Sequence, residues 1–379
     1  MPPKRRTTTG KSPASRSSSR RTKKPAPSSL KAPKAAPATL GYRMPAEWEP
    51  HEATWLAWPH NRESWPDKFE PIPEVWVRMI SGLVKGEPVH LLVKDEALYE
   101  EAVGLLERAK VPADRVAFHR WPTYDAWARD FGPVFVVREG PDPVGIVDWV
   151  YNAWGGKYPP FDLDDAIPKK AAELLNLPCW EPGIVMEGGS LDVNGRGTLL
   201  TTEQCLLNKN RNPKLSREQI EQRLKDYLGV RKVLWLGEGI AGDDTDGHVD
   251  DITRFVAPDT ILTAVEEDPK DANHAPLAEN LRRLKEMTDA EGKPFRILTM
   301  PMPGPVEFKG QRLPASYGNF YIGNEAVLLP VYNHPNDRRA AEVLQSCFPA
   351  RRIVKIPSQD LIWGLGACHC VTQQQPAAP

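Results

Sequence analysis

The sequence lacks the features that mark membrane-embedded and secreted proteins. It has no apolar run of roughly 18 residues or more, so we expect no transmembrane helix. The basic first residues are not followed by the apolar stretch of a secretory signal. Cysteine is scarce, with five scattered residues in 379, and an odd number in a long chain is typical of reduced thiols. Together these absences predict a cytoplasmic protein with no membrane partner.

Acidic residues are missing from residues 1–40, which contain 11 Lys and Arg. This segment is rich in Ser, Pro, Ala and Lys and has almost no large apolar side chains, so it cannot bury enough surface to offset its ordering entropy. We therefore expect a disordered tail. It could be a solubilising extension, which this composition favours, or an arm for nucleic acid, a membrane surface or a targeting receptor.

The remaining residues, 41–379, carry 38 basic and 50 acidic residues, a formal net charge of −12. This balance argues against nucleic-acid binding by the body of the protein. No linker divides it, so we expect a single domain. Apolar spacing predicts helices at 95–110, 216–229, 275–287 and 337–347. Short strands are expected at 90–93, 233–236, 296–300 and 352–356, which together with the helices gives an α/β fold.

A weak repeat runs through this body. In four segments a polar residue is followed by a short strand, a turn of the EG, NG, PD or GN type and a second apolar strand. The opening residues are Asp130, Glu187, Asp250 and Asn319, separated by 57, 63 and 69 residues, and Cys370 follows 51 residues later. Such a repeat suggests five units around a common axis, as in a propeller. An ordinary α/β protein with hairpins at these intervals is the alternative.

The run Cys368, His369, Cys370 raises the question of a metal site. It lacks the second ligand pair of a structural zinc site, and consecutive residues of an extended chain point in alternate directions. If the repeats share an axis, carboxylates would surround the thiol and favour a cation. A guanidinium fits better than a metal, because it is planar, permanently charged and pairs with carboxylates through two parallel hydrogen bonds.

A thiolate above a guanidinium plane can attack its central carbon, and histidine is the usual proton donor near neutral pH. His248 and Asp250 are two residues apart, so on a strand they would share one face. Taken singly, Asp130 and Asn319 read as turn residues and Cys370 as a buried thiol. Their combination favours a guanidinium site.

Seven segments, in order, resemble the agmatine deiminase and bacterial-type peptidylarginine deiminase family, which belongs to the guanidino-group-modifying (pentein) enzymes. They are MPAEWEPHEATWLAWP (44–59), DAWARDFGPVFV (125–136), VDWVYNAWGG (147–156), MEGGSLDVNGRGTLLTT (186–202), GHVDDITRF (247–255), SYGNFYIGN (316–324) and CHCVTQQQP (368–376). The resemblance covers residues 41–379. It implies a five-bladed α/β propeller in one domain, with the active site on the pseudo-fivefold axis and no cofactor or metal.

The resemblance also implies roles for individual residues. Cys370 matches the nucleophile, His248 the general acid/base, and Asp130 and Asp250 the guanidinium-binding carboxylates. Three further positions match the substrate side of the site: Glu187, Trp127 and Asn319. We expect hydrolysis through a covalent amidino-cysteine that releases ammonia and leaves a ureido product. A homo-oligomer is compatible with the sequence.

Two segments depart from the family pattern. HNRESWPDKF (60–69) stands where agmatine deiminases carry Arg-Pro-Asp-Asn-Trp. Ala153, Trp154 and two glycines stand where the peptidylarginine enzymes have arginines suited to a peptide carboxylate. Agmatine, converted to N-carbamoylputrescine for polyamine synthesis, is the favoured small guanidinium substrate. Peptidylarginine, other small guanidines and a non-catalytic cation-binding relative are the alternatives.

Overall fold

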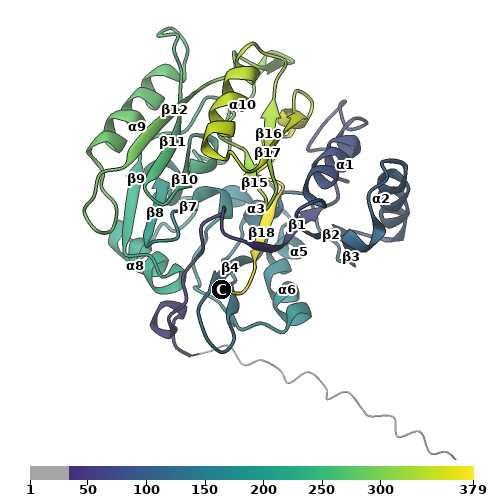
Figure 1. Ribbon diagram of the computed structural model, residues 1–379, viewed down its shortest axis with the longest axis horizontal. Coiled ribbons are helices and arrows are strands. Elements are labelled where there is room, and N and C mark those ends of the chain that lie inside the picture. The colour runs from purple at the N-terminus through teal and green to yellow at the C-terminus, as the bar shows by residue number, and fades with distance from the viewer. Residues whose placement is uncertain (1–33) are drawn as a thin grey trace, which may run out of the picture.

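The computed structural model describes residues 34–379 (Figure 1). The expected disordered tail covers residues 1–40, and its residues 1–33 lie outside the described part of the chain. Its last residues, Pro37–Leu40, form the 3-10 helix η1, which contacts helix α8 (Arg217–Leu228). The described body therefore begins before residue 41.

The fold is mixed α/β. Between residues 34 and 379 the chain forms five sheets of three or four strands and one separate hairpin, β13 (Glu307–Phe308) with β14 (Gln311–Arg312). In every three-stranded sheet the first two strands are antiparallel and the third is parallel to the second. These sheets contain β4 (Val134–Val137), β5 (Val144–Val147) and β6 (Cys179–Trp180); β7 (Asp192–Val193), β8 (Thr198–Thr202) and β9 (Lys232–Leu236); β10 (Thr253–Ala257), β11 (Thr260–Val265) and β12 (Arg296–Pro301); and β15 (Tyr321–Ile322), β16 (Ala326–Val331) and β17 (Arg352–Pro357).

The four-stranded sheet repeats this pattern with strands from both ends of the chain. Strand β18 (Gln373–Pro376) pairs antiparallel with β1 (His51–Ala57), and β2 (Val89–Val93) and β3 (Val116–Arg120) follow in parallel. The last strand thus completes the sheet that the first strand begins. This pairing holds the segment just before β18, which contains Cys370, against the N-terminal part of the body.

Helices occupy the connections between parallel strands, as crossover geometry requires. Figure 1 shows the longer ones toward the periphery, with the single turn α3 (Ala128–Phe131) near the middle. The other helices are α1 (Ile72–Leu83), α2 (Glu96–Arg108), α4 (Ala153–Gly156), α5 (Asp162–Asp165), α6 (Ile167–Leu175), α7 (Glu203–Leu206), α9 (His274–Glu286) and α10 (Asn336–Cys347). Among residues 34–379, no helix combines the length and the apolar character needed to span a membrane.

Local sequence explains where helix α8 begins and ends. Ser216 Oγ accepts a hydrogen bond from the Gln219 amide, and the Gln219 side chain accepts one from the Ser216 amide, which closes a capping box at the start of α8. Gly229 ends the helix with a φ of 65°, a left-handed conformation that glycine adopts without strain. The predicted helices at 95–110, 216–229, 275–287 and 337–347 are confirmed as α2, α8, α9 and α10.

Candidate active site

Five short turns precede the five antiparallel strand pairs, and each carries a residue singled out in the sequence. Three of the turns are α3 with Asp130, η3 (Gly188–Ser190) directly after Glu187, and η4 (Val249–Asp251), which contains Asp250 and follows His248. The other two are hydrogen-bonded turns at 317–318, before Asn319, and at 368–371, with Cys370. Turn η3 contacts both α3 and η4. The structure therefore brings these residues together.

The expectation that His248 and Asp250 share a strand face is wrong. His248 precedes η4 and Asp250 lies within it, so the backbone turns instead of running extended. The cause is local: the His248 amide donates to Asp243 Oδ2 and to Thr245 Oγ1, both at 3.2 Å, which bends the chain.

Gly189 marks the point where the charged groups converge. A Cβ at this position would lie 2.5 Å from His248 Nδ1, 2.8 Å from Asp130 Oδ1 and 3.0 Å from Asp250 Oδ2. The Gly189 amide also donates to Asp130 Oδ1 at 2.9 Å. Only a residue without a side chain leaves these three groups so close together.

The Cys370 thiol is fixed by a neighbouring amide. Asn319 Nδ2 lies 3.0 Å from Cys370 Sγ, and Asn319 Oδ1 accepts from the amides of His369 at 2.9 Å and Cys370 at 3.3 Å. Asp250 Oδ2 lies 4.0 Å from the sulfur. Burial raises the pKa of the Cys370 thiol well above its usual value, and the Asp250 and Asp251 carboxyls raise it further. A bound cation between thiol and carboxylates would oppose this shift.

Asp130 accepts two hydrogen bonds, from the Gly189 amide and from Trp154 Nε1 at 2.9 Å. Burial raises the pKa of Asp130 to about 6, and the Asp250 and Glu187 charges add to this effect. At neutral pH the carboxylate is therefore mostly ionised and able to bind a cation.

Trp154 reaches Asp130 through an unusual backbone. The four residues of α4, Ala153 to Gly156, have positive φ angles of 52°, 55°, 92° and 79°. The left-handed conformation costs a non-glycine residue of order 1 kcal/mol, and such strain concentrates at functional sites. A Cβ on Gly155 would also meet the Asn210 side chain at 2.4 Å. The segment that departs from the family's arginine pattern thus forms part of the site wall.

Asp250 is held in position by a buried relay of hydrogen bonds that runs through His369 to Glu47. His369 Nδ1 lies 2.6 Å from Asp250 Oδ2, and His369 Nε2 lies 2.7 Å from Glu47 Oε2. Arg254 Nη2 also donates to Glu47 Oε2 at 2.8 Å. Burial would raise the pKa of Asp250, but the hydrogen bond from His369 and its charge lower it. Sequence reasoning missed these supports, because it gave His369 no role beside Asp250 and did not consider Glu47.

His248 is fully buried between two carboxylates. Its Nδ1 lies 3.8 Å from Asp130 Oδ1, and its Nε2 lies 3.9 Å from Glu187 Oε2. Burial alone would lower the pKa of His248, but Asp130, Cys205 and Glu187 together outweigh it and hold the pKa well above its usual value. The other Glu187 oxygen accepts from Arg211 Nε at 2.7 Å. The raised pKa favours the protonated form of His248, which can donate a proton.

A cavity of about 900 Å³ leads to these groups. Cys370, Asp130 and Trp127 line it, so Trp127, expected on the substrate side of the site, lies at the cavity wall. Other aromatic and acidic lining residues are Tyr124, Tyr151, Trp154, Tyr158, Trp363, Glu63, Asp125, Asp164 and Asp244, and three basic residues, Arg62, Lys94 and Lys157, also line the cavity. His248, Asp250, Glu187 and Asn319 lie behind this lining and are buried. The cavity suits a small organic cation.

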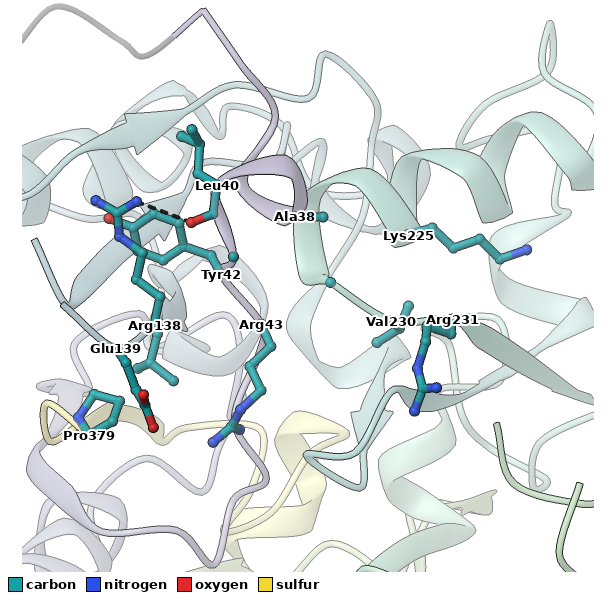
Figure 2. Close-up of a pocket in the computed structure, with 13 residues that line it drawn as sticks. Ala38, Leu40, Tyr42, Arg43, Arg138, Glu139, Lys225, Val230, Arg231 and Pro379 are labelled. Atoms are coloured by element: carbon teal, nitrogen blue, oxygen red, sulfur yellow. Dashed lines mark hydrogen bonds between the residues drawn. The ribbon is translucent and has the colours of Figure 1, made fainter. Parts of the chain in front are cut away.

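A second cavity of about 690 Å³ lies beside η1 and α8 (Figure 2). Its basic side chains already have partners: Arg43 pairs with Glu49 at 2.7 Å, and Arg138 donates to the Leu40 carbonyl at 3.1 Å. None of the predicted site residues lines it. We therefore place the candidate active site in the larger cavity.

Among residues 34–379, two clusters of donor atoms are compact enough to hold a metal ion, each with its three donors within 4.8 Å of one another. They are Glu187, Cys205 and His248, and Asp250, Asp251 and Cys370. The expected absence of a metal remains a prediction.

Known proteins share this architecture. The profile of the Porphyromonas-type peptidyl-arginine deiminase family matches residues 43–376. An agmatine deiminase from Ectopseudomonas mendocina is 38% identical over 364 residues, covering 90% of this chain and 97% of the relative. The solved agmatine deiminase of Enterococcus faecalis is 35% identical, with a TM-score of 0.85 over 91% of this chain and 98% of that one. A substrate-bound agmatine deiminase of C. jejuni is 30% identical, with a TM-score of 0.81 over 89% and 97%.

Proposed function

The chain belongs to the Porphyromonas-type peptidyl-arginine deiminase family, and we propose that it hydrolyses agmatine to N-carbamoylputrescine and ammonia. The relatives named agmatine deiminase support this substrate. One observation supports the chemistry most directly. The Cys370 thiol lies 4.0 Å from Asp250 at an acid-lined cavity, and the acids and His248 converge on Gly189.

We further propose that the five sheets are blades of one propeller-like domain spanning residues 41–379. The shared strand order of the sheets and the pairing of β18 with β1 support this arrangement. The axis would pass through the turns that carry the site residues. A propeller places one turn of each blade at its centre, which explains why residues from five distant segments meet.

In the proposed complex, Asp130 and Asp250 bracket the guanidinium and fix its plane. Carboxylates that bind a guanidinium through paired hydrogen bonds also keep it charged, so its central carbon stays electrophilic. The unpaired Asp250 Oδ1 and the ionised Asp130 supply the acceptors. Trp127 and Trp154 would cover the faces of the planar group.

Hydrolysis then proceeds in two halves. The guanidinium charge lowers the pKa of the Cys370 thiol, whose proton passes to solvent, and the thiolate adds to the central carbon. His248 gives its proton to the departing nitrogen, the C–N bond breaks, and ammonia leaves an amidino-cysteine. Neutral His248 takes a proton from water, and the hydroxide adds to the same carbon. The C–S bond then breaks with its electron pair going to sulfur, and the added hydroxyl passes its proton to that sulfur as the ureido carbonyl forms. The ureido product departs and the Cys370 thiol is restored.

The end of the substrate opposite the guanidinium should also determine which guanidine is preferred. Agmatine ends in an ammonium group, whereas arginine carries an additional carboxylate at the same end. The cavity is lined by five acids (Glu63, Asp125, Asp130, Asp164 and Asp244) and three bases (Arg62, Lys94 and Lys157). This excess of acids would attract the ammonium group and repel the carboxylate. We therefore expect a higher kcat/KM for agmatine than for arginine or for peptides with a C-terminal arginine.

The test is ammonia and ureido-product release from these three substrates by the full chain. Cys370→Ser should reduce agmatine turnover by about 10³-fold or more, because the hydroxyl is a far weaker nucleophile. Cys368→Ser, which removes a buried thiol two residues away, is the matched control and should keep its activity. Turnover should survive a chelator and be lost to iodoacetamide. Full turnover by Cys370→Ser would end this mechanism.

Three sequence-based expectations stay predictions. They are the cytoplasmic location, the homo-oligomer and the role of the basic segment before residue 41. The product, N-carbamoylputrescine, would enter putrescine synthesis.

A further inference from the structure

Cys205 lies close to His248, does not line the cavity and has no part in the proposed hydrolysis. Its helix α7 is fixed by Thr202, whose hydroxyl accepts from the Cys205 amide at 3.2 Å and donates to the Gly247 carbonyl at 2.6 Å. Gly247 directly precedes His248, so one side chain sets the positions of both residues. Cys205, His248 and Glu187 are all 0% exposed.

Three polar atoms of these residues have no hydrogen-bond partner among the described residues: Glu187 Oε2 and both His248 ring nitrogens. Two of them, Glu187 Oε2 and His248 Nε2, lie 3.9 Å apart. Unpaired buried polar atoms are uncommon, because each costs about 1–3 kcal/mol. Arg211 donates to Glu187 Oε1 and not to Oε2, and it also donates to Asp246 Oδ2 at 2.6 Å. Glu187 Oε2 and His248 Nε2 therefore remain available to a ligand.

The donor set suits a thiophilic divalent metal. The thiol sulfur, the imidazole nitrogen and the carboxylate oxygen lie within 4.8 Å of one another. Tetrahedral zinc holds nitrogen and oxygen at about 2.0–2.2 Å and sulfur at about 2.3 Å, which places its ligand atoms about 3.4–3.7 Å apart. Shifts of about 1 Å or less would complete this geometry. One imidazole, one thiolate and one carboxylate are ligands that zinc accepts.

The other compact cluster is less suitable. Asn319 already donates to Cys370 Sγ at 3.0 Å and to Asp251 Oδ1 at 3.0 Å. The Asp250 oxygen nearest the sulfur, Oδ2, pairs with His369 at 2.6 Å. A metal there would find one unpaired oxygen, Asp250 Oδ1, but would have to compete with these hydrogen bonds for Cys370 and Asp251, whereas the Cys205 cluster leaves both Glu187 Oε2 and His248 Nε2 unpaired.

We propose that Zn²⁺, or another thiophilic divalent cation, binds Cys205, His248 and Glu187 and inhibits the enzyme. Binding releases the Cys205 thiol proton and the His248 proton at Nε2 to solvent, and both atoms bond the metal. A metal-bound His248 can no longer give that proton to departing ammonia. The inhibition rests on the proposed role of His248, but the binding itself does not.

Binding is tested by titrating Cd²⁺ into the full chain and recording the ultraviolet cadmium–thiolate absorption. The background carries Cys179→Ser and Cys347→Ser, which remove the two half-buried thiols. Cys205→Ser should abolish the band, while Cys370→Ser and the buried control Cys368→Ser should keep it. A band lost in Cys370→Ser and kept in Cys205→Ser would assign the cation to the nucleophile and overturn the proposal. A band unaffected by any variant would show adventitious binding and also overturn it.

Inhibition is tested with Zn²⁺ in the agmatine assay, each variant being compared with its own metal-free rate. A chelator should restore the rate, and Cys205→Ser should raise the half-inhibitory Zn²⁺ concentration at least about tenfold. Cys368→Ser should leave that concentration unchanged. An unchanged value in Cys205→Ser would contradict inhibition at this site.

A crystal of the unmodified chain soaked in Cd²⁺ gives a reading that depends on no variant. An anomalous peak among Cys205 Sγ, His248 Nε2 and Glu187 Oε2 supports the site, and a peak only at Cys370 or at the surface overturns it. If cadmium binds at Cys205 but the protein releases no ammonia from any guanidine, the proposed function is refuted and the proposed metal site is supported. If the protein turns over agmatine but no cadmium binds at Cys205, the metal site is refuted and the proposed function is supported.

Discussion

Gly189 is a position where one added methyl group should disturb catalysis at least as much as folding. His248, Asp130 and Asp250 surround it, and a Cβ would approach their nearest atoms to 2.5, 2.8 and 3.0 Å. The backbone at Gly189 is not in the left-handed region, so alanine meets no conformational barrier there. The effect of Gly189→Ala should therefore come from these three contacts alone.

The size of the effect follows from the distances. Ordinary van der Waals contact begins at 3.4 Å, so the His248 ring must retreat by about 0.9 Å and the two carboxylates by somewhat less. A misplacement of about 1 Å in a reacting group can cost about 10²-fold in rate, equivalent to about 2.7 kcal/mol. Overpacking should destabilise the fold by about 1–3 kcal/mol, partly offset by about 0.4–1 kcal/mol from a less flexible unfolded chain.

The assay measures kcat/KM for agmatine alongside thermal unfolding. Gly104→Ala is the matched control, because a Cβ there meets only the flexible Arg108 side chain at 3.6 Å. It lies inside helix α2, so alanine should keep full activity and add about 0.5–1 kcal/mol of stability. A folded Gly189→Ala protein with the parent kcat/KM would refute the convergence of the three groups at this point.

Three further outcomes follow from the site. First, kcat/KM should fall as pH drops through about 6. Burial and nearby charges raise the pKa of Asp130 to about 6, and the protonated carboxyl no longer attracts a guanidinium. A flat pH profile of kcat/KM in this range would contradict the role of Asp130. Second, Trp154→Phe should move this fall to higher pH, since the indole hydrogen bond lowers the pKa of Asp130, and a move to lower pH would count against it. Third, His369→Gln cannot donate to both Glu47 and Asp250, so urea unfolding should report a loss of about 3–5 kcal/mol, and an unchanged midpoint would show that the relay is not stabilising.

Elements with strong local signals were predictable from the sequence. Helix α8 begins at a capping box and ends at Gly229, and both signals lie within a few residues of the helix they delimit. The hairpin turns likewise marked the antiparallel pairs, since turn chemistry is local. The spacing of the repeat predicted that the polar residues at the start of each strand pair would lie around a common axis. The structure places them around one site.

The supporting residues could not be found in this way, because their contacts join distant parts of the chain. Glu47 and His369 lie 322 positions apart, and no spacing rule links them. Trp154 was noticed only as a departure from a family pattern, since its left-handed backbone cannot be inferred from a tryptophan. The error at His248 and Asp250 has a local cause, because the Asp243 and Thr245 side chains impose a turn that their two-residue spacing does not reveal.

The pairing of β18 with β1 has a consequence for biosynthesis. Ribosomes deliver a chain from its first residue onward, and early segments fold while later ones are still being made. Here Cys370 and the strand that anchors it follow Asp130, His248 and Asp250 in the chain, and so does His369, which holds Asp250. A nascent polypeptide therefore lacks both the proposed nucleophile and the support of Asp250 until translation has passed residue 370, and it lacks the anchoring strand until residue 376.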